Sequence, residues 1–448
     1  MEHLILIGNP GNRRTEGLQE ARRQLGLEPA LVIPYLDLLQ GTTTMTEACQ
    51  RLGLPADAVP MLRLDAPSED FQVERLLIAL GAPDAPADQR DERLLAYGSI
   101  PDPHPLAEEE AHSIREEAGR LYHPSQWFRG YMRLLGRLER ETKELWPVPF
   151  WLNAPSDIAA MFDKRVTHRI LSGAGIPVPK LLAPPAELPD YEALREAMLR
   201  KGKHRVFVKL AHGSGACGVV AYQLNPRTGA EVAVTTLGVE QHLTRPPVYY
   251  NAIKPFRYTE PKGIRLLLNW LLAHGAHVEE WITKATYQGR AFDVRQLVVD
   301  GQACHSIARL SRTPITNLHL RSERKSLEEL GLPEKIRLAA GGAAERALSL
   351  FPRSLVAGVD VLLRQGTYAP VIGELNPFGD LLYRVDHQGY GTYAWEMKQL
   401  PDYDTWRARG VAAEVAEAEA AEVAKVKAAE AEVAEAEVDA GASGGTAP

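Results

Sequence analysis

The segment at residues 358–378 constrains this chain most, because it predicts a hairpin in which two acids face each other. Apolar runs flank a short turn in this segment. In an antiparallel hairpin centred on Thr367, Asp360 lies opposite Glu374, and Asn376 follows two residues along on the same face. Carboxylates paired across two strands destabilise a sheet unless a cation lies between them. Oxygen ligands of this kind suit Mg²⁺, so we expect a metal site here.

A glycine-rich loop joins two other apolar runs, at residues 206–210 and 218–222, and together they predict a second hairpin. The residues of this loop that have small side chains or none are Gly213, Ser214, Gly215, Ala216 and Gly218. Backbone N–H groups in such a loop can approach phosphate oxygens closely. Strand alternation places Lys209 on the same face as Phe207, just before the loop. A single strand lysine usually extends to solvent, and no Walker A sequence is present, so this hairpin alone is weak evidence of a phosphate site.

Two charged residues occupy one face of a predicted strand at residues 292–299. Alternation places Asp293 and Arg295 on the same side of this strand. It begins twelve to fourteen residues after the sequence Glu-Glu-Trp-Ile at residues 279–282. A pair of this kind is as often a structural salt bridge as part of a binding site, and the segment alone leaves both interpretations open.

The N-terminal part of the chain alternates short apolar runs with helix-like sequence, which predicts a parallel α/β layer. The runs are at residues 3–7, 30–34 and 61–64, and one of the helical stretches is at residues 71–80. The loop at residues 8–12 follows the first strand, where a ligand could bind, but it lacks the GxGxxG spacing. A tight turn is therefore the favoured interpretation of this loop.

A domain boundary is expected near residue 153. A long amphipathic helix is predicted at residues 126–145 and a strand at 147–152. The next predicted helix contains Asp163 and Lys164 and ends at the Gly- and Pro-rich residues 173–177. With 448 residues, two or three domains are the prior expectation. We expect domains at residues 1–153 and 154–405, followed by a tail at residues 406–448.

The composition is that of an ordinary globular protein. Apolar residues make up 45% and charged residues 24% of the chain, which excludes wholesale disorder and a fibrous architecture. No 18 consecutive residues are apolar, and residues 1–8 lack the basic stretch and cleavage site of a signal peptide. Cys49, Cys217 and Cys304 are too far apart to form a CxxC motif. We therefore expect a cytoplasmic protein.

The net charge of -7 is confined to the tail. Of the chain's 58 acidic and 51 basic residues, residues 411–448 contain nine and two, which leaves 49 of each in residues 1–410. The rest of the chain is thus electrically balanced and lacks the overall excess of positive charge that is typical of proteins that bind nucleic acid or an anionic membrane. The tail is almost entirely Ala, Glu and Val before a Gly/Ser-rich end, so we expect it to be transiently helical or disordered.

Truncation after Gly410 is expected to change the melting temperature by little, because residues 411–448 lack aromatic residues, Leu and Ile and can bury little apolar area. Thermal unfolding of the full and truncated chains would measure the effect. A fall of many degrees would instead indicate a docked helix.

In their order and spacing, these segments resemble the ATP-grasp superfamily, most closely the ribosomal-protein glutamate ligases and the ATP-binding part of glutathione synthetase. The resemblance covers about residues 153–400 and extends to the preceding α/β domain. It implies an α/β (α+β) protein with an N-terminal parallel pre-ATP-grasp domain at residues 1–153. An ATP-grasp domain of two α+β subdomains would follow at residues 154–405, and the low-complexity tail would complete the chain.

The resemblance also implies roles for individual residues. Lys164 and Lys209 would bracket the ATP phosphates, and the loop at 213–218 would cover them. Arg295 would neutralise the phosphorylated intermediate, and Arg309 lies where the family often has another phosphate-facing base. The metal ligands would be Asp360, Glu374 and Asn376. Asn317 would join the substrate wall.

The adenine would be bound by a hinge segment, whose residues are Glu279, Glu280, Trp281 and Ile282. In the family, backbone groups of such a hinge form the hydrogen bonds to adenine. The family usually has an acid after the hinge that binds the ribose. In this chain Lys284 lies near that position.

The implied activity is that of an ATP-dependent carboxylate–amine ligase that acts through an acyl phosphate, with ATP and two Mg²⁺ ions as cofactors. The expected partners are small-molecule or peptide carboxylate and amine substrates, with no nucleic acid and no membrane; a homodimer is left open. Two alternatives share the nucleotide site: a kinase that phosphorylates a hydroxyl group, and a scaffold without catalysis. A scaffold predicts the loss of metal ligands, and none is lost here.

Overall fold

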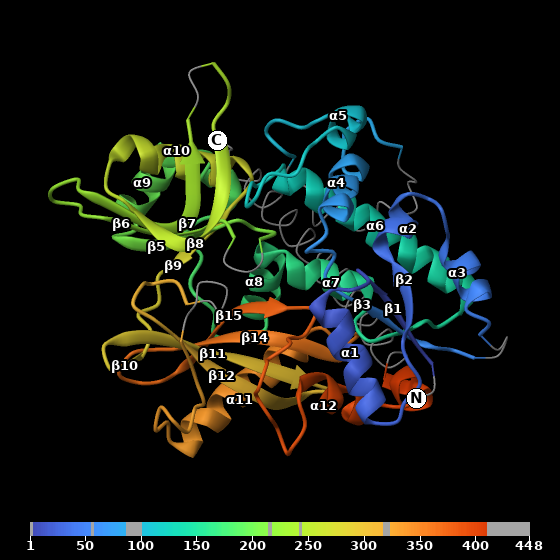
Figure 1. Ribbon diagram of the computed structural model, residues 1–448. Coiled ribbons are helices and arrows are strands. Elements are labelled where there is room, and N and C mark those ends of the chain that lie inside the picture. Colours follow the sequence, from blue (N-terminus) through green and yellow to red (C-terminus); the bar gives the residue numbers. More distant parts are fainter. Residues whose placement is uncertain are drawn as a thin grey trace, which may run out of the picture. The chain divides into compact units, whose positions relative to one another are not determined.

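The computed structural model describes residues 3–54, 58–86, 101–213, 217–241, 244–316 and 323–409 (Figure 1). The chain divides into two compact units, Met1–Leu400 and Pro401–Pro448, and the fold below is that of the first. In the second, residues 403–409 are helical, and the expected tail from residue 410 onward lies outside the described residues. The expected boundaries at 153 and 405 remain predictions.

The N-terminal part contains a four-stranded parallel sheet in the order β2-β1-β3-β4. Its strands are β1 (Leu4–Gly8), β2 (Leu31–Pro34), β3 (Met61–Leu64) and β4 (Phe150–Trp151). Every residue of β1 and β3 is buried, as expected when helices cover both faces of a parallel sheet. The predicted parallel α/β layer is confirmed, although β4 is shorter than the predicted strand at 147–152.

Six helices accompany this sheet: α1 (Arg13–Gln24), α2 (Tyr35–Leu39), α3 (Met45–Arg51), α4 (Phe71–Leu80), α5 (Glu108–His112) and α6 (Pro124–Leu145). The loop after β1 ends in Asn12, whose side chain caps α1 by accepting hydrogen bonds from the N–H groups of Arg14 and Thr15. Helices α4 and α6 cross closely at Gly81 and Gly130. A Cβ on Gly130 would lie 1.8 Å from the Leu77 carbonyl oxygen. Only glycine fits there.

Two helices lead from this region toward the other sheets, where we expected one. Helix α7 (Pro155–Phe162) ends at Asp163, and α8 (Lys164–Gly173) begins directly after it. The extended backbone of Asp163 breaks the helix, and its carboxylate accepts a hydrogen bond from Arg165 N–H as the cap of α8. Lys164 is therefore the first residue of a new helix.

The second sheet is antiparallel, in the order β8-β7-β6-β5-β9. Its strands are β5 (Arg205–Lys209), β6 (Val219–Leu224), β7 (Glu231–Glu240), β8 (Val248–Tyr258) and β9 (His277–Glu280). Helices α9 (Tyr191–Arg200) and α10 (Pro261–Ala273) bury their apolar side chains with those of the strands (Figure 1). A short 3-10 helix, η2 (Pro185–Glu187), precedes α9. The hairpin predicted around the glycine-rich loop is confirmed as β5 and β6.

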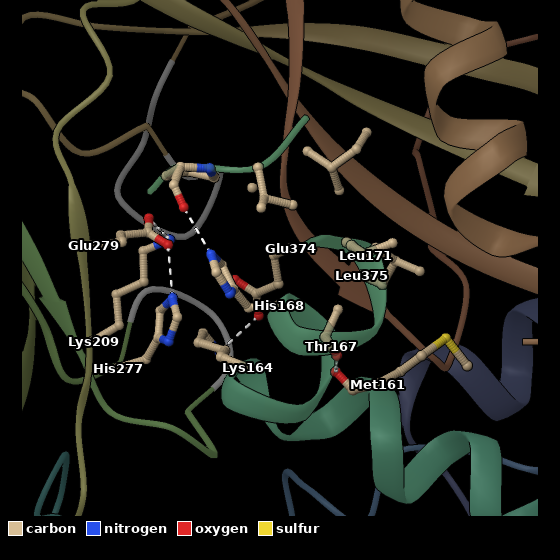
Figure 2. Close-up of a pocket in the computed structure, with 14 residues that line it drawn as sticks. Met161, Lys164, Thr167, His168, Leu171, Lys209, His277, Glu279, Glu374 and Leu375 are labelled. Carbon is tan, nitrogen blue, oxygen red and sulfur yellow. Dashed lines mark hydrogen bonds and ion pairs between the residues drawn. The ribbon is translucent and has the colours of Figure 1, made fainter. Parts of the chain in front are cut away.

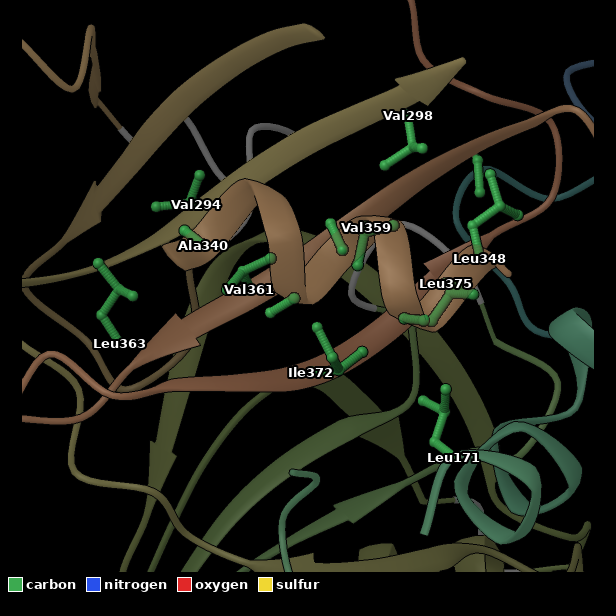
Figure 3. Close-up of a cluster of buried hydrophobic side chains, with 14 of the residues drawn as sticks. Leu171, Val294, Val298, Ala340, Leu348, Val359, Val361, Leu363, Ile372 and Leu375 are labelled. Carbon is green, nitrogen blue, oxygen red and sulfur yellow. The ribbon is translucent and has the colours of Figure 1, made fainter. Parts of the chain in front are cut away.

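The third sheet is also antiparallel, in the order β13-β12-β11-β14-β15, with β10 paired to β11. Its strands are β10 (Thr286–Tyr287), β11 (Arg290–Val299), β12 (Gln302–Ser311), β13 (Glu323–Lys325), β14 (Val356–Leu363) and β15 (Pro370–Asn376). Helix α11 (Glu334–Leu348) and the strands share one buried apolar cluster (Figure 3). Helix α12 (Thr392–Gln399) follows the sheet. The α/β (α+β) class is thus confirmed, with one parallel and two antiparallel sheets.

None of the helices that the structure describes combines the length and the apolar character that crossing a lipid bilayer requires.

Candidate functional site

Residues of the second and third sheets line a cleft of about 690 Å³ that is open to solvent. Eight of the predicted site residues line it: Lys164, Lys209, Gly213, Glu279, Glu280, Ile282, Asp360 and Glu374. A smaller cavity of about 350 Å³ shares Lys164, Lys209, Glu279 and Glu374 with it (Figure 2). The fold therefore brings together residues more than 200 positions apart in the chain.

The acidic hairpin has the predicted register at Asp360 and Glu374, but nearer the turn the pairing differs from the prediction by one residue. Asp360 of β14 pairs directly with Glu374 of β15, and Gly358 pairs with Asn376. Beyond Asp360 the register shifts by one, because Val361 pairs with Ile372 and leaves Gly373 as an extra residue. A bulge of this kind locally changes the direction of side chains and often occurs beside binding sites.

Basic side chains neutralise both acids of the hairpin. Lys164 places its Nζ 2.9 Å from Glu374 Oε1 (Figure 2). The same ammonium group also donates to the Gly213 carbonyl oxygen. Asp360 forms ion pairs with Arg295 and with Arg309, whose Nη2 lies 2.8 Å from Asp360 Oδ2. Burial acts to raise the pKa of Asp360, but the two guanidinium groups outweigh it and hold this pKa below its usual value.

The donor set of the hairpin fits Mg²⁺. Among the described residues, no three His, Cys, Asp or Glu side chains are grouped to hold a metal ion by themselves. Two carboxylates and an amide are, however, a common protein contribution to a magnesium site that substrate phosphates complete. Asn376 at present donates from Nδ2 to the Gly358 carbonyl oxygen, 3.1 Å away. The assignment of Asp360, Glu374 and Asn376 as metal ligands remains a prediction.

Lys209 meets a buried acid from the hinge. Its ammonium group forms an ion pair with Glu279, which is 3% exposed, and His277 Nε2 lies 3.1 Å from the other carboxylate oxygen (Figure 2). Burial acts to raise the pKa of Glu279, but Lys209 and His277 lower it to about 2. Glu279 is therefore the counterion of Lys209.

The rest of the hinge is only partly open to a ligand. Glu280 N–H donates to the Lys180 carbonyl oxygen at 2.8 Å, so this group is already used. Trp281 does not line the cleft; its ring packs against Phe207 with a centroid distance of 5.2 Å. Ile282 does line it.

Eight other predicted residues lie either beside the cleft or outside the described residues. Gly218 has a φ of +65°, and a Cβ there would lie 2.6 Å from Leu210 Cβ, so the end of the loop requires glycine. Arg295, Arg309 and Asn376 support the cleft through their bonds and do not line it. Ser214, Gly215, Ala216 and Asn317 lie outside the described residues.

Asp293 and Arg295 of β11 do not form a mutual salt bridge; among the described residues they are connected only through Arg309 and Asp360. Asp293 accepts two hydrogen bonds from Arg309, at 2.8 and 2.9 Å, and also accepts one from Thr316. Arg295 turns to β14 and also lies 2.7 Å, through Nε, from Asp380 Oδ2. The two side chains share a face as alternation predicted, but each pairs across the sheet.

Three residues of the site were not predicted as binding residues. Lys284, Thr316 and Asp293 line the cleft and are connected, because Lys284 Nζ donates to Thr316 Oγ1 at 2.6 Å. In the sequence Lys284 is notable only because it lies where an acid was expected. No local pattern identifies Thr316, whose partners lie 23 and 32 residues away.

Replacing Lys284 by methionine is expected to stabilise the free protein at pH 7. Burial lowers the pKa of Lys284 to about 8, so the folded state binds fewer protons than the unfolded state between pH 8 and about 10.5. Stability contributed by this group therefore rises with pH over that range, and below it the buried ammonium costs up to about 3 kcal/mol. Thermal unfolding should give a higher midpoint for Lys284→Met than for wild type at pH 7, with a smaller difference at pH 10. A lower midpoint at pH 7 would contradict this.

The sequence matches no protein-family model and none of the curated proteins. Solved structures do align with it. The ATP-grasp ligase PsnB in complex with a minimal precursor aligns with a TM-score of 0.46 at 16% identity, over 91% of this chain and 99% of PsnB. D-cycloserine synthetase DcsG aligns with a TM-score of 0.45 at 14% identity, over 88% of this chain and 98% of DcsG. The macrocyclase MdnC from Microcystis aeruginosa MRC, bound to its precursor peptide MdnA, aligns with a TM-score of 0.45 at 12% identity, over 89% and 99%.

Proposed function

We propose that this protein is an ATP-dependent carboxylate–amine ligase that forms an amide or peptide bond through an acyl phosphate. The observation that carries the proposal is the acidic hairpin, whose two opposed carboxylates face a cleft and are each neutralised by a basic side chain. An arrangement of opposite charges in a cleft is suited to a polyanionic nucleotide bound with a metal. The motifs that resemble the ATP-grasp superfamily support the same conclusion.

The charges of the cleft favour a nucleotide that arrives with metal ions. In and around the cleft, six basic side chains are equalled in number by six acids. The basic residues are Lys164, Lys203, Lys209, Lys284, Arg295 and Arg309, and the acids are Glu279, Glu280, Asp293, Asp360, Glu374 and Asp380. ATP adds about four negative charges, which need further compensation before a carboxylate can approach. Two Mg²⁺ ions, held by Asp360, Glu374 and Asn376 together with phosphate oxygens, would supply that charge.

Each basic residue then has a definite role in the reaction. If metal ions were held by the hairpin, Lys164 would lose its partner Glu374 and Arg295 would keep only Asp380, so both side chains could bind phosphate oxygens. Lys209 stays fixed by Glu279 near the glycine-rich loop, and Arg309 stays fixed by Asp293. The loop would exclude water from the intermediate.

The proposed reaction has two steps, and neither requires a covalent bond between the substrate and the enzyme. A carboxylate oxygen of the first substrate attacks the γ-phosphorus of ATP, the bond to the bridging oxygen breaks, and ADP leaves. An amine then attacks the acyl carbon, phosphate departs with the electron pair of the broken C–O bond, and the amine loses a proton. Small-molecule or peptide acids and amines both fit this chemistry.

Hydroxylamine distinguishes this ligase from a kinase on the same site. The protein is incubated with ATP, Mg²⁺, hydroxylamine and a pool of amino acids or a cell extract, and the products are analysed by mass spectrometry. A ligase gives ADP together with a hydroxamate, because hydroxylamine captures an acyl phosphate. A stable phosphorylated product with no hydroxamate would replace the ligase by the kinase.

Arg295→Ala is expected to reduce hydroxamate formation by about a hundredfold to a thousandfold. The arginine provides charge stabilisation of a kind that is worth roughly 3 to 4 kcal/mol in comparable electrostatic sites. Arg346→Ala, which removes an exposed arginine of α11 that does not line the cleft, is a matched control and should retain wild-type rates. Equal rates for the two variants would remove Arg295 from the mechanism.

A further inference from the structure

Lys284 is the one basic residue of the cleft cluster without a carboxylate partner among the residues that the structure describes. Lys164, Lys209, Arg295 and Arg309 each form an ion pair with an acid. Lys284 is 8% exposed and lines the cleft, and its ammonium group donates a hydrogen bond to the neutral hydroxyl of Thr316. An ammonium group has three N–H donors, so two remain for a ligand.

Asp293, the acid whose charge acts most strongly on Lys284, is held by other partners. It accepts two hydrogen bonds from Arg309 and one from the Thr316 hydroxyl. The hydrogen bonds therefore run from Lys284 to Thr316 and from Thr316 to Asp293. This chain orients the lysine while leaving its charge largely uncompensated. A buried cation in this condition is unfavourable for folding and is typical of a site that receives an anion.

The positive charge and the N–H donors of the lysine ammonium group also indicate which part of a nucleotide it would bind. An acid at this position could accept hydrogen bonds from ribose hydroxyls, whereas an ammonium group has no lone pair and prefers anionic oxygen. The charged groups that act on Lys284 are Asp293, Arg309, Lys209 and Asp360. All four belong to the cluster around the acidic hairpin, where the proposed function expects the phosphates.

We propose that Lys284 is a specificity-determining residue that binds a phosphate oxygen of the nucleotide, in place of an acid that would bind the ribose. This inference rests on the proposed function, since it assumes that a nucleoside triphosphate occupies the cleft. It goes further by assigning a phosphate contact to a residue after the hinge. It also predicts that affinity depends more on the phosphates than on the ribose hydroxyls.

The test measures nucleotide binding by calorimetry and needs no acceptor substrate. Wild type, Lys284→Met and Lys284→Gln are titrated with ATP, 2′-deoxy-ATP and adenosine in the presence of Mg²⁺. Both variants should weaken ATP binding by about tenfold to a hundredfold, as expected for loss of a hydrogen bond between charged groups, and change adenosine binding by less than about twofold. Removing the 2′-hydroxyl should change wild-type affinity by less than about threefold. The exposed Lys335→Met on α11 is the matched control and should bind as wild type does.

The outcomes separate this inference from the function on which it rests. If wild type does not bind ATP, the proposed function itself fails. If wild type binds ATP and both Lys284 variants bind it equally well, only the phosphate contact is overturned. Equal weakening of ATP and adenosine would mean that Lys284 shapes the cleft without meeting phosphate, which also overturns the inference. Circular dichroism of each variant checks that it is folded.

Discussion

Glu374→Gln is expected to abolish ADP formation, with a loss of about a thousandfold or more, because metal-assisted charge stabilisation is worth several kcal/mol. The substitution preserves the shape of the side chain, removes its charge and leaves Lys164 without its ion-pair partner. The Glu374 side chain is 25% exposed, so the fold should tolerate the change. ADP release in the presence of ATP, Mg²⁺ and the substrate pool measures the effect.

Two comparisons make this result interpretable. Glu196→Gln removes the same charge on α9 from a side chain that is 77% exposed, and it should retain wild-type activity. Asp360→Asn should also inactivate the protein, but it additionally frees the buried Arg309 from one partner and should lower stability. Wild-type turnover by folded Glu374→Gln would refute the metal assignment.

Glu396→Leu is expected to lower the free energy of unfolding by about 3 to 5 kcal/mol, the usual effect of removing one partner of a buried ion pair. Arg63 Nη1 lies 2.6 Å from Glu396 Oε2, and both residues are at most 1% exposed. An arginine cannot lose its proton at neutral pH, so its charge would stay buried without compensation. Thermal or denaturant unfolding measures the loss.

The double variant Arg63→Met with Glu396→Leu is the informative control. Replacing both ions by apolar side chains removes the desolvation cost together with the attraction, so much of the stability should return. A double variant as unstable as Glu396→Leu would show that the pair contributes through its shape or through the contact of Arg63 with Tyr393.

The predictable part of the site is the part that strand geometry controls. The pairing of Asp360 with Glu374 agrees with the prediction, but it depends on the bulge at Gly373, because the pairs nearer the turn are shifted by one residue from a hairpin centred on Thr367. The helix break at Asp163 could not be predicted from the helix-like sequence around it, because it depends on the backbone conformation of a single residue. The roles that the family resemblance gave to Arg295, Arg309 and the hinge remain predictions, although the structure gathers them around one cleft.

The sequence by itself determined the strands, the alternation along them and hence which charged residues face the same side. Only the tertiary structure decided which charges meet. Lys164 reaches Glu374 across 210 residues, and Arg309 pairs with Asp293 and Asp360 because β11 lies between β12 and β14. Ion pairs of this kind depend on strand order and burial, which arise from packing of the whole sheet and are not encoded in any short segment. Lys284 illustrates the difference, since its burial and its lack of an acid partner among the described residues follow from that packing.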